Sequence, residues 1–418
     1  MPPVLMGLLG VASLLLIAVV FSSDRKAINL RTVGGAFALQ AAVPAFVLFT
    51  PFGGDVLQSV SGGVQAVIDS ANTGIAFMFG PLVSPKMFEV YDGNGFVFAL
   101  KVLPIIIFFA SLMAALYYMG IMQWVIRIFG GLLEKALGTS RTESMSAAAN
   151  VFVGQTEAPL VVKPFIRKMT RSELFAVMSG GLASVAGSVL AGYASIGIDL
   201  NYLVAASFMA APGGLLMAKI LVPETETPLD QEFDVASDDD ESEGECAVNV
   251  IDAAAMGASS GLKLAANVGA MLVAFIALIA LINVLFGVAG SLLGFEAITL
   301  QLLLGYVFSP IAFLLGVPWD EAVQAGSFLG QKLVLNEFVA YIDFATVKET
   351  MSLQAQAIIT VALCGFANLS SMAILLGGLG VMAPSRRGDI ARLGLKAVMA
   401  GTLSNFMSAA LVGIFTSI

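Results

Sequence analysis

The sequence predicts an all-α integral membrane protein with eight transmembrane helices and two re-entrant hairpins in an inverted repeat. Of the 418 residues, 58% are hydrophobic and 12% are charged, about half the charged fraction of an ordinary soluble domain. Apolar stretches of spanning length recur along the chain. Two acids, Glu157 and Glu337, lie in short glycine-containing segments far from any hydrophilic tail. An acid at membrane depth is costly unless it meets a partner, a proton, an ion or a polar substrate, so we predict a solute transporter.

Eight apolar stretches are long enough to cross a bilayer, which requires about 20 residues. They cover residues 4–21, 33–50, 97–119, 173–195, 201–221, 265–290, 354–377 and 394–415. The stretch 300–316 is slightly shorter and contains Ser309-Pro310, so we expect it to lie at the outer surface. The first stretch is not a cleavable signal, because its positive charges follow the apolar core.

Basic residues predict the orientation of these spans, since they accumulate on the cytoplasmic side. Three clusters follow the first span or precede the fourth and the last, namely Arg25, Lys26 and Arg31; Lys163, Arg167, Lys168 and Arg171; and Arg386, Arg387, Arg392 and Lys396. Placing all three clusters in the cytoplasm predicts that both termini lie outside.

An acidic segment separates the two halves of the chain. Between Glu224 and Glu245 there are eleven acids and no base, and removing these charges from the total of −9 leaves +2. We interpret residues 223–250 as a solvated cytoplasmic loop. A calcium site would need an ordered oxygen cage with a turn glycine, which this spacing does not provide.

An internal repeat predicts the architecture. GLASVAGSVL at 181–190 aligns without gaps to GFANLSSMAI at 365–374. Each copy follows a segment that contains an acid, and each precedes one more span. We therefore predict that each repeat consists of a hairpin, an interrupted helix and a helix. Opposite orientations of the two copies would place a binding site near the membrane midplane. The alternative is that similarity in Gly, Ala and Ser is only compositional.

Composition excludes several other functions. The chain has no histidine and only two cysteines, Cys246 and Cys364, so zinc, haem and histidine-dependent catalysis are not expected and no disulfide is implied. No basic patch exists to bind nucleic acid. Paired carboxylates could serve a membrane-embedded enzyme, but no nucleophile–base pair or cofactor motif accompanies them. A channel and an elevator for a carboxylate or amino acid remain as alternatives, although the latter would call for a fixed cation or open helix N-termini.

Four segments carry a family resemblance: ESMSAAANVFVGQTEAPLVVKPF, ELFAVMSGGLASVAGSVLAGY, NEFVAY and CGFANLSSMAILLGGLG. They resemble bacterial concentrative nucleoside transporters, also called sodium/nucleoside cotransporters. The resemblance implies a homotrimer in the bacterial inner membrane that imports nucleosides such as uridine, cytidine and adenosine by an elevator mechanism. It implies a scaffold from residues 1–120, with an interfacial helix within 63–86, and from residues 251–316. It also implies a mobile transport domain from residues 140–222 and 317–418.

The resemblance also implies a substrate site. Gln155, Thr156 and Glu157 would face the base; Glu337, Asn368 and Ser371 would bind the ribose; and Val189 and Phe366 would supply apolar contacts. Amides and acids suit base edges and hydroxyl groups, whereas an apolar surface suits the face of the base.

Each of these residues has a structural alternative. Asn368 and Ser371 would share a helix face and could join helices, whereas Phe366 would join them only at a helix interruption and could instead pack in the core or face lipid. Gln155 and Thr156 could cap a half-helix beginning near Pro159. The two acids could form ion pairs, Glu157 with Lys163 and Glu337 with Lys332.

The resemblance assigns a sodium site to the same region. Asn150 and Ser184 would give side-chain oxygens, and Val153 and Val185 would give carbonyl oxygens. Sodium is a hard cation that prefers such oxygen ligands, particularly where a helix unwinds. Proton coupling through Glu157 or Glu337 remains the alternative.

Overall fold

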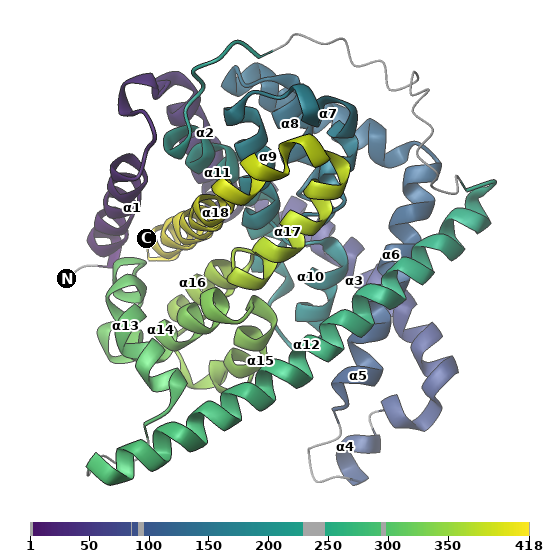
Figure 1. Cartoon of the computed structure of the whole chain (residues 1–418). Helices are drawn as coiled ribbons and strands as arrows, with labels where there is room; N and C mark the ends of the chain where they lie inside the picture. The colour runs from purple at the N-terminus through teal and green to yellow at the C-terminus, as the bar shows by residue number, and fades with distance from the viewer. Residues whose placement is uncertain (1–2, 85, 91–95, 229–246, 294–297, 418) are drawn as a thin grey trace.

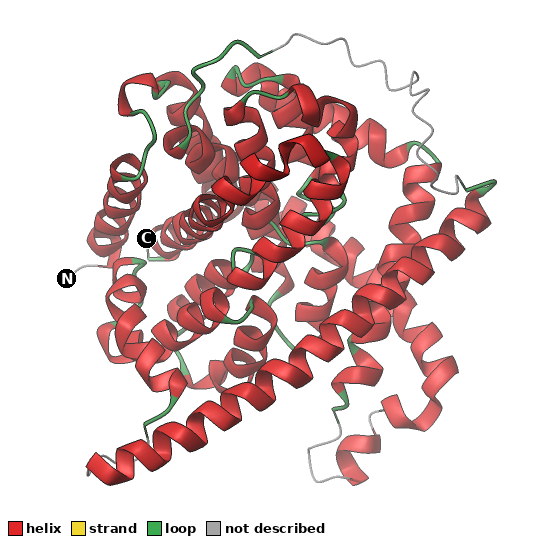
Figure 2. Cartoon of the chain, viewed as in Figure 1, coloured by secondary structure: helices red, strands yellow, loops and turns green. Residues whose placement is uncertain are grey.

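The computed structural model describes residues 3–84, 86–90, 96–228, 247–293 and 298–417. All regular structure in this part of the chain is helical, as Figure 2 shows. The α-helices are α1 Pro3–Val20, α2 Leu30–Phe49, α3 Pro51–Phe79, α4 Lys86–Val90, α5 Phe98–Lys101, α6 Leu103–Tyr118, α7 Ile121–Leu137, α8 Arg141–Ala149, α9 Arg171–Ala183, α10 Gly187–Ser195, α11 Leu200–Leu221, α12 Val250–Leu293, α13 Leu300–Leu314, α14 Trp319–Val334, α15 Glu337–Val347, α16 Leu353–Leu363, α17 Leu369–Met382 and α18 Arg387–Thr416.

Two copies of one helical unit make up the interior. In the first copy α8 and the 3-10 helix η3 (Ala158–Lys168) form a hairpin, α9 and α10 form a broken helix, and α11 is continuous. In the second copy α14 and α15 form the hairpin, α16 and α17 the broken helix, and α18 the continuous helix (Figure 1). The predicted order of hairpin, interrupted helix and helix is therefore confirmed in both halves.

Burial separates this interior from an outer layer. In the apolar 18-residue stretches of α9–α10 and of α11, 94% of the residues are buried. In the corresponding stretch of α12, 11% are buried. An apolar helix that stays exposed requires lipid or another protein chain around it. The outer helices α2, α3, α6 and α12 therefore form the membrane-facing or subunit-facing layer.

The spans differ in detail from the predicted ones. By length and composition seven segments of the described residues could cross a membrane, or eight if the bent pair α13–α14 counts as one. The predicted stretch 354–377 is two shorter helices, α16 and α17, because residues 364–368 leave the helical conformation. The stretch 300–316 is α13, which bends by 115° into α14 and so does not form one straight span with it.

Two predicted boundaries were wrong. An interfacial helix was expected within 63–86, but α3 already begins at Pro51, where Thr50 caps it by accepting a hydrogen bond from Gly53 N. Helix α12 has 44 residues instead of the 26 of the predicted stretch 265–290, a length of about 66 Å at the α-helical rise. It runs diagonally across the molecule in Figure 1.

Small residues allow α12 to pack closely on α6. A Cβ atom at Gly257 would lie 2.6 Å from the Ala110 carbonyl oxygen, and one at Gly261 would lie 2.8 Å from Ile107 Cα. Backbones can approach this closely only where side chains are absent, as is usual for helices packed in lipid.

Candidate functional site

The first hairpin places its tip on the broken helix α9–α10. Helix α8 ends near Asn150, and η3 begins after Glu157, so residues 150–157 form the tip. Gly187 N donates to the Phe152 carbonyl over 3.2 Å. A Cβ atom at Gly181 would lie 3.0 Å from Gln155 Cβ, so the glycine gives the tip its room.

The residues predicted to bind sodium lie in the two segments that pack together at this junction. A Cβ atom at Gly180 would lie 3.2 Å from Asn150 Nδ2. A Cβ atom at Gly154 would lie 3.2 Å from Ala186 Cβ. Gly154 follows Val153 in the chain, and Ala186 follows Val185. Asn150 donates to the Ser146 carbonyl over 3.0 Å, while its Oδ1 atom is buried and has no partner among the described residues.

Further oxygens at the junction are also free. Within the described part of the chain, no hydrogen bond ends on the carbonyl of Val153 or Val185, both of which lie outside helices. Ser184 Oγ makes only a long contact of 3.5 Å to the Gly181 carbonyl. Buried oxygens without donors are the arrangement that a hard cation would complete.

The two helix breaks are bonded to each other. Phe366 N donates to the Ser184 carbonyl over 3.1 Å, which joins the break of the second repeat to that of the first. Phe366 therefore lies in a helix interruption, the condition under which it was expected to join the site. Its half-buried ring faces the first hairpin, 3.9 Å from a Cβ placed at Gly154.

Asn368 is the N-cap of α17. Its Oδ1 atom accepts from Ser371 N over 2.7 Å and from Ser370 Oγ over 2.7 Å. The expectation that Asn368 and Ser371 share a face of a regular helix was therefore wrong, because the cap residue is extended and precedes the first turn. Capping leaves the Asn368 amide nitrogen free to point away from the helix.

Glu337 accepts a hydrogen bond from that amide group. Its Oε2 atom accepts from Asn368 Nδ2 over 2.8 Å, and its Oε1 atom accepts from Tyr193 OH over 3.0 Å. Glu337 opens α15, where Asn336 caps the helix by accepting from Val339 N over 2.8 Å. The carboxylate is thus fixed by both repeats at a depth where it is only 5% exposed.

Tyr193 is a site residue that the sequence reasoning missed. It lies one helical turn after Val189, which is also buried, so both belong to the same side of α10. A tyrosine within an apolar stretch that also holds predicted substrate residues was the available signal, because a buried hydroxyl needs a partner.

Neither acid forms an ion pair among the described residues. The ion pair expected as an alternative between Glu337 and Lys332 is absent there, because Lys332 Nζ donates instead to the Ala362 carbonyl and Asn405 Oδ1, each over 2.7 Å. Glu157 does not pair with Lys163; its Oε2 atom accepts from Gly154 N over 3.3 Å.

Lys332 and Asn405 connect the two helix breaks through hydrogen bonds. Asn405 Nδ2 donates to the carbonyls of Ala183 and Cys364, over 2.6 and 3.0 Å. These carbonyls lie at the C-terminal ends of the half-helices α9 and α16, which carry partial negative charge. Lys332 therefore bonds the end of α16 directly, and Asn405 bonds the ends of both half-helices, a second feature that the sequence reasoning missed.

The remaining predicted residues surround the first tip. Gln155 is buried, and its Oε1 atom has no partner in the described part of the chain. Thr156 packs on α17, where a Cβ at Gly378 would lie 3.2 Å from its Cγ2 atom. Neither caps η3, whose N-cap position is Glu157 without a side-chain bond, so that alternative was wrong.

A cavity of about 760 Å³ reaches this region. It lies between the first hairpin and α10 on one side and α6, α7 and α12 on the other, and its lining includes Glu157, Phe152 and Ser188. Glu337, Asn368 and Phe366 do not line it. The structure therefore exposes the acid of the first hairpin to the cavity and keeps the acid of the second hairpin covered.

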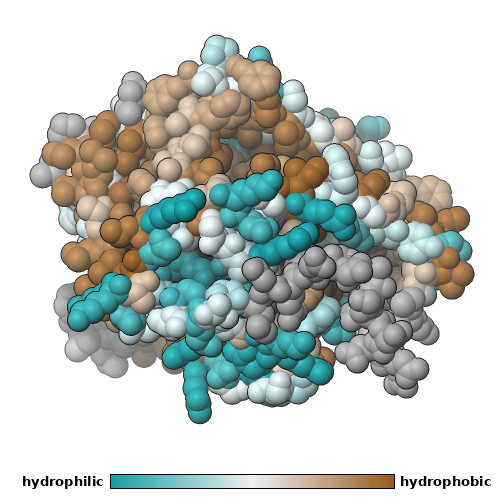
Figure 3. Space-filling model, turned by 90° about the horizontal axis from the view of Figure 1, so that it is seen from above, coloured by the Kyte–Doolittle hydropathy of each residue, from teal (hydrophilic) through white to brown (hydrophobic). Residues whose placement is uncertain are grey.

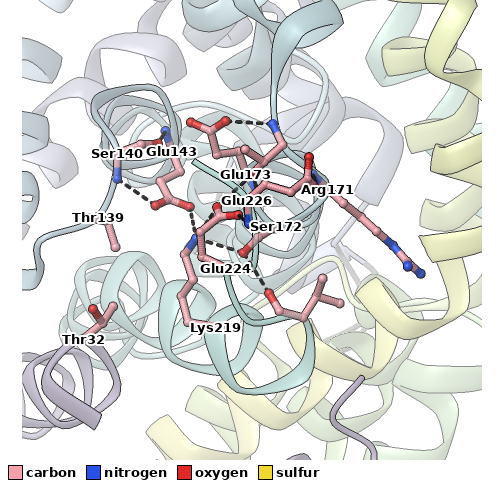
Figure 4. A network of polar contacts seen from close by, with 12 residues as sticks. Thr32, Thr139, Ser140, Glu143, Arg171, Ser172, Glu173, Lys219, Glu224 and Glu226 are labelled. Carbon is pink, nitrogen blue, oxygen red and sulfur yellow. Dashed lines mark hydrogen bonds and ion pairs between the residues drawn. The ribbon is translucent and has the colours of Figure 1, made fainter. Parts of the chain in front are cut away.

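A polar network fixes the end of the first hairpin opposite its tip (Figure 4). Glu143 of α8 pairs with Lys219 of α11, with 2.7 Å between Oε2 and Nζ and both side chains buried. Lys219 also donates to Ser172 Oγ over 3.0 Å, and Glu224 accepts from Thr170 Oγ1 over 2.8 Å. Burial raises the pKa of Glu143 above the ordinary value, and Lys219 opposes this effect.

This end of the molecule is hydrophilic. The face at the top of Figure 1, seen from above in Figure 3, gathers hydrophilic side chains at its centre and toward the lower edge of the view, with apolar ones above and to the sides. A polar face on an apolar body is the arrangement expected where a membrane protein meets water.

Comparisons with known proteins cover nearly the whole chain. Residues 9–82 and 202–413 match the N-terminal and C-terminal parts of the family described as "Na+ dependent nucleoside transporter", and residues 99–199 match the family "Nucleoside recognition". The chain is 56% identical to an uncharacterized transporter, YutK, of Bacillus subtilis, covering 99% of each chain. It is 53% identical to nucleoside permease NupC of Helicobacter pylori, covering 98% of this chain and 97% of that one.

A mammalian protein and a solved structure are also similar. Sodium/nucleoside cotransporter 1 of mouse is 38% identical over 99% of this chain, which spans 64% of that longer protein. The structure of CNTnw in an inward-facing substrate-bound state superposes with a TM-score of 0.95 at 59% identity, covering 99% of this chain and 98% of that one. A substituted form of CNTnw in an outward-facing state gives a TM-score of 0.94.

Proposed function

Because the chain belongs to the concentrative nucleoside transporter family and is a nucleoside transporter rather than an enzyme, we propose that it imports nucleosides by symport with sodium. The observation that carries this proposal is the bonded junction of the two helix breaks. There a doubly hydrogen-bonded carboxylate lies in the second repeat and a set of unpartnered oxygens lies in the first. Uridine, cytidine and adenosine are the proposed substrates.

The proposed recognition divides between the repeats. Glu337, held by Tyr193 and Asn368, would accept hydrogen bonds from the ribose hydroxyls, with Ser371 beside it. A carboxylate has about four lone-pair sites, so two protein donors leave room for two more. Gln155, Thr156 and Glu157 would read the edge of the base, and the unpartnered Gln155 oxygen is available for this. Val189 and Phe366 would contact its face.

The proposed sodium site uses Asn150, Ser184, Val153 and Val185. Their free oxygens, described above, suit sodium because it is satisfied by neutral oxygen ligands without a surrounding cluster of acids. Two matching family descriptions and the mouse relative name sodium, which supports this assignment. Binding of the ion would stiffen the junction that holds the base-reading tip, and this gives a physical basis for coupling.

Sodium dependence is the direct test. Replacing sodium by choline at constant pH should abolish concentrative uptake of labelled uridine into proteoliposomes. Asn150→Ala should raise the sodium concentration for half-maximal uptake by about tenfold, the effect of losing roughly 1.4 kcal/mol of ligand binding. Undiminished uptake in choline that a protonophore collapses would assign the coupling to protons instead.

The proposed mechanism moves the repeats past a static scaffold. Residues 140–222 and 317–418 would form the transport domain, and residues 1–120 and 251–316 the scaffold of a homotrimer. The low burial of α6 and α12 supports a partner or lipid on that side. An enclosed site that travels with its substrate avoids exposing charged groups to lipid. We place the hydrophilic end in the cytoplasm, with both termini outside, because it carries the basic clusters.

A cross-link between the two proposed bodies tests this movement. A Cβ at Gly192 of α10 would lie 3.2 Å from Val102 Cγ1, next to α6. Gly192→Cys with Val102→Cys, with Cys246 and Cys364 replaced by alanine, should lose uptake when joined by a short thiol reagent while still binding uridine. The control pair is Gly269→Cys with Leu103→Cys, which lies within the scaffold, with 3.0 Å between a Cβ at Gly269 and Leu103 Cδ1. Full uptake by a completely cross-linked first pair would exclude a large movement of the domain.

A further inference from the structure

The cavity beside the first hairpin carries an excess of positive charge that nucleoside binding does not explain. Its charged lining residues are Glu157, Arg127 on α7, and Lys163 and Lys168 on η3. Three cations and one acid give a net charge of +2. A neutral nucleoside needs a hydrogen-bonding pocket with an apolar wall, and it carries no negative charge with which three cations could pair.

These three cations are available to a ligand. The ion pairs of the described residues involve Lys219, Lys348 and Arg386. Within the same part of the chain, no residue forms a hydrogen bond or ion pair with the side chains of Arg127, Lys163 or Lys168. Arg127 and Lys168 are exposed and Lys163 is half-buried, and all three line the cavity.

The cavity is also lined by apolar side chains. Met113, Ile126 and Phe152 line the same cavity, and Glu157 belongs to the hairpin tip that we assign to the base. A ligand matched to this lining has a planar, partly apolar body with hydrogen-bonding edges and a doubly negative group at one end. A phosphate monoester carries a charge of about −1.5 to −2 at neutral pH, and lysine and arginine are its usual partners.

We propose that this cavity binds a nucleoside 5′-monophosphate from the side of the basic clusters and that the bound nucleotide inhibits transport. The assignment rests on the proposed function, since it places the base at the Glu157 tip, and it adds a phosphate subsite formed by Arg127, Lys163 and Lys168. Phosphoryl transfer to the 5′-hydroxyl of an imported nucleoside produces this ligand, so accumulation of the product would slow further import.

Inhibition rather than transport follows from the position of the cations. Arg127 belongs to α7, and the two lysines belong to the first hairpin, so a phosphate bound by all three bridges two elements across the cavity. Arg127 lies outside the proposed transport domain, so movement of that domain with a bound dianion would require the phosphate to leave Arg127 at a large desolvation cost.

The test is displacement of labelled uridine from the purified protein by uridine 5′-monophosphate. The nucleotide should displace uridine. The double variant Lys163→Gln, Lys168→Gln should lower the affinity for the nucleotide by about tenfold or more and change the affinity for uridine by less than about twofold. Arg127→Gln should have the same effect from the opposite wall. Arg167→Gln is the matched control, because Arg167 is exposed on the same 3-10 helix but does not line the cavity; it should leave both affinities unchanged.

Other outcomes overturn the proposal. Equal displacement by inorganic phosphate would mean a plain anion site. Loss of the nucleotide effect in phosphatidylcholine vesicles containing phosphatidylglycerol, but not in pure phosphatidylcholine, would assign the cations to lipid headgroups. Equal nucleotide affinity in the parent and the lysine variants would remove the phosphate subsite. Uridine binding in the same experiment reports on the proposed function separately, since a protein that binds uridine but not its monophosphate contradicts only this inference.

Discussion

Glu337→Ala is expected to abolish measurable uptake of ribonucleosides while the protein remains folded. Each hydrogen bond from a ribose hydroxyl to the carboxylate should contribute roughly 1.5–3 kcal/mol. Losing two of them would lower uridine affinity by about two orders of magnitude or more. Glu337→Ala also leaves Tyr193 OH and Asn368 Nδ2 without their acceptor, which disturbs the geometry around the ribose. Equilibrium binding and uptake of labelled uridine measure the effect, with thermal unfolding as the check on folding.

Two controls separate recognition from positioning. Tyr193→Phe removes one hydrogen-bond donor to Glu337 and keeps the carboxylate. It should therefore lower the affinity for uridine less than Glu337→Ala does. Free uracil, which lacks the ribose, should compete poorly with uridine in the parent protein. Parental transport by Glu337→Ala, or equal competition by uracil and uridine, would remove the ribose role from this acid.

Lys219→Met is expected to lower the free energy of unfolding by about 3–5 kcal/mol at neutral pH. Its ammonium group is the buried partner of Glu143, and the variant leaves that carboxyl group without a cation in a site where the side chain is 1% exposed. The double variant Glu143→Gln, Lys219→Met should recover most of the loss, because it removes both charges together. Thermal or denaturant unfolding of the purified protein measures both.

The deficit of Lys219→Met should depend on pH. Burial already raises the pKa of Glu143 in the folded protein, and Lys219 opposes that rise. Without the lysine, the folded-state pKa should rise further above that of the unfolded chain. The folded variant then binds a proton that the unfolded chain has released, so its stability falls as pH rises through this interval. We expect the loss in the free energy of unfolding to be smallest at mildly acidic pH. A deficit that is constant with pH, or a double variant no more stable than the single one, would contradict this account.

The sequence by itself determined the class of the protein and the order of its elements. Apolar length, sparse charge and glycine-containing acidic segments are local properties, and they predicted a helical membrane protein with two hairpins and two interrupted helices. The repeat between 181–190 and 365–374 predicted both breaks, which the structure has at 184–186 and 364–368. The motifs were long enough to predict the family. The roles of Asn150 in sodium binding and of Glu337 in ribose binding stay predictions.

Only the tertiary structure decided which polar groups meet. Tyr193 and Glu337 are 144 positions apart, and Lys332 and Asn405 are 73 apart, so no spacing rule relates them. The cap formed by Asn368 escaped prediction because it depends on the residue at which the break ends. In an apolar body each buried polar group must find a partner, but many partners are compatible with one hydropathy pattern. Packing of the two repeats selects among them, and so it is the fold that joins Glu337 to Tyr193 and leaves Asn150 with a free oxygen.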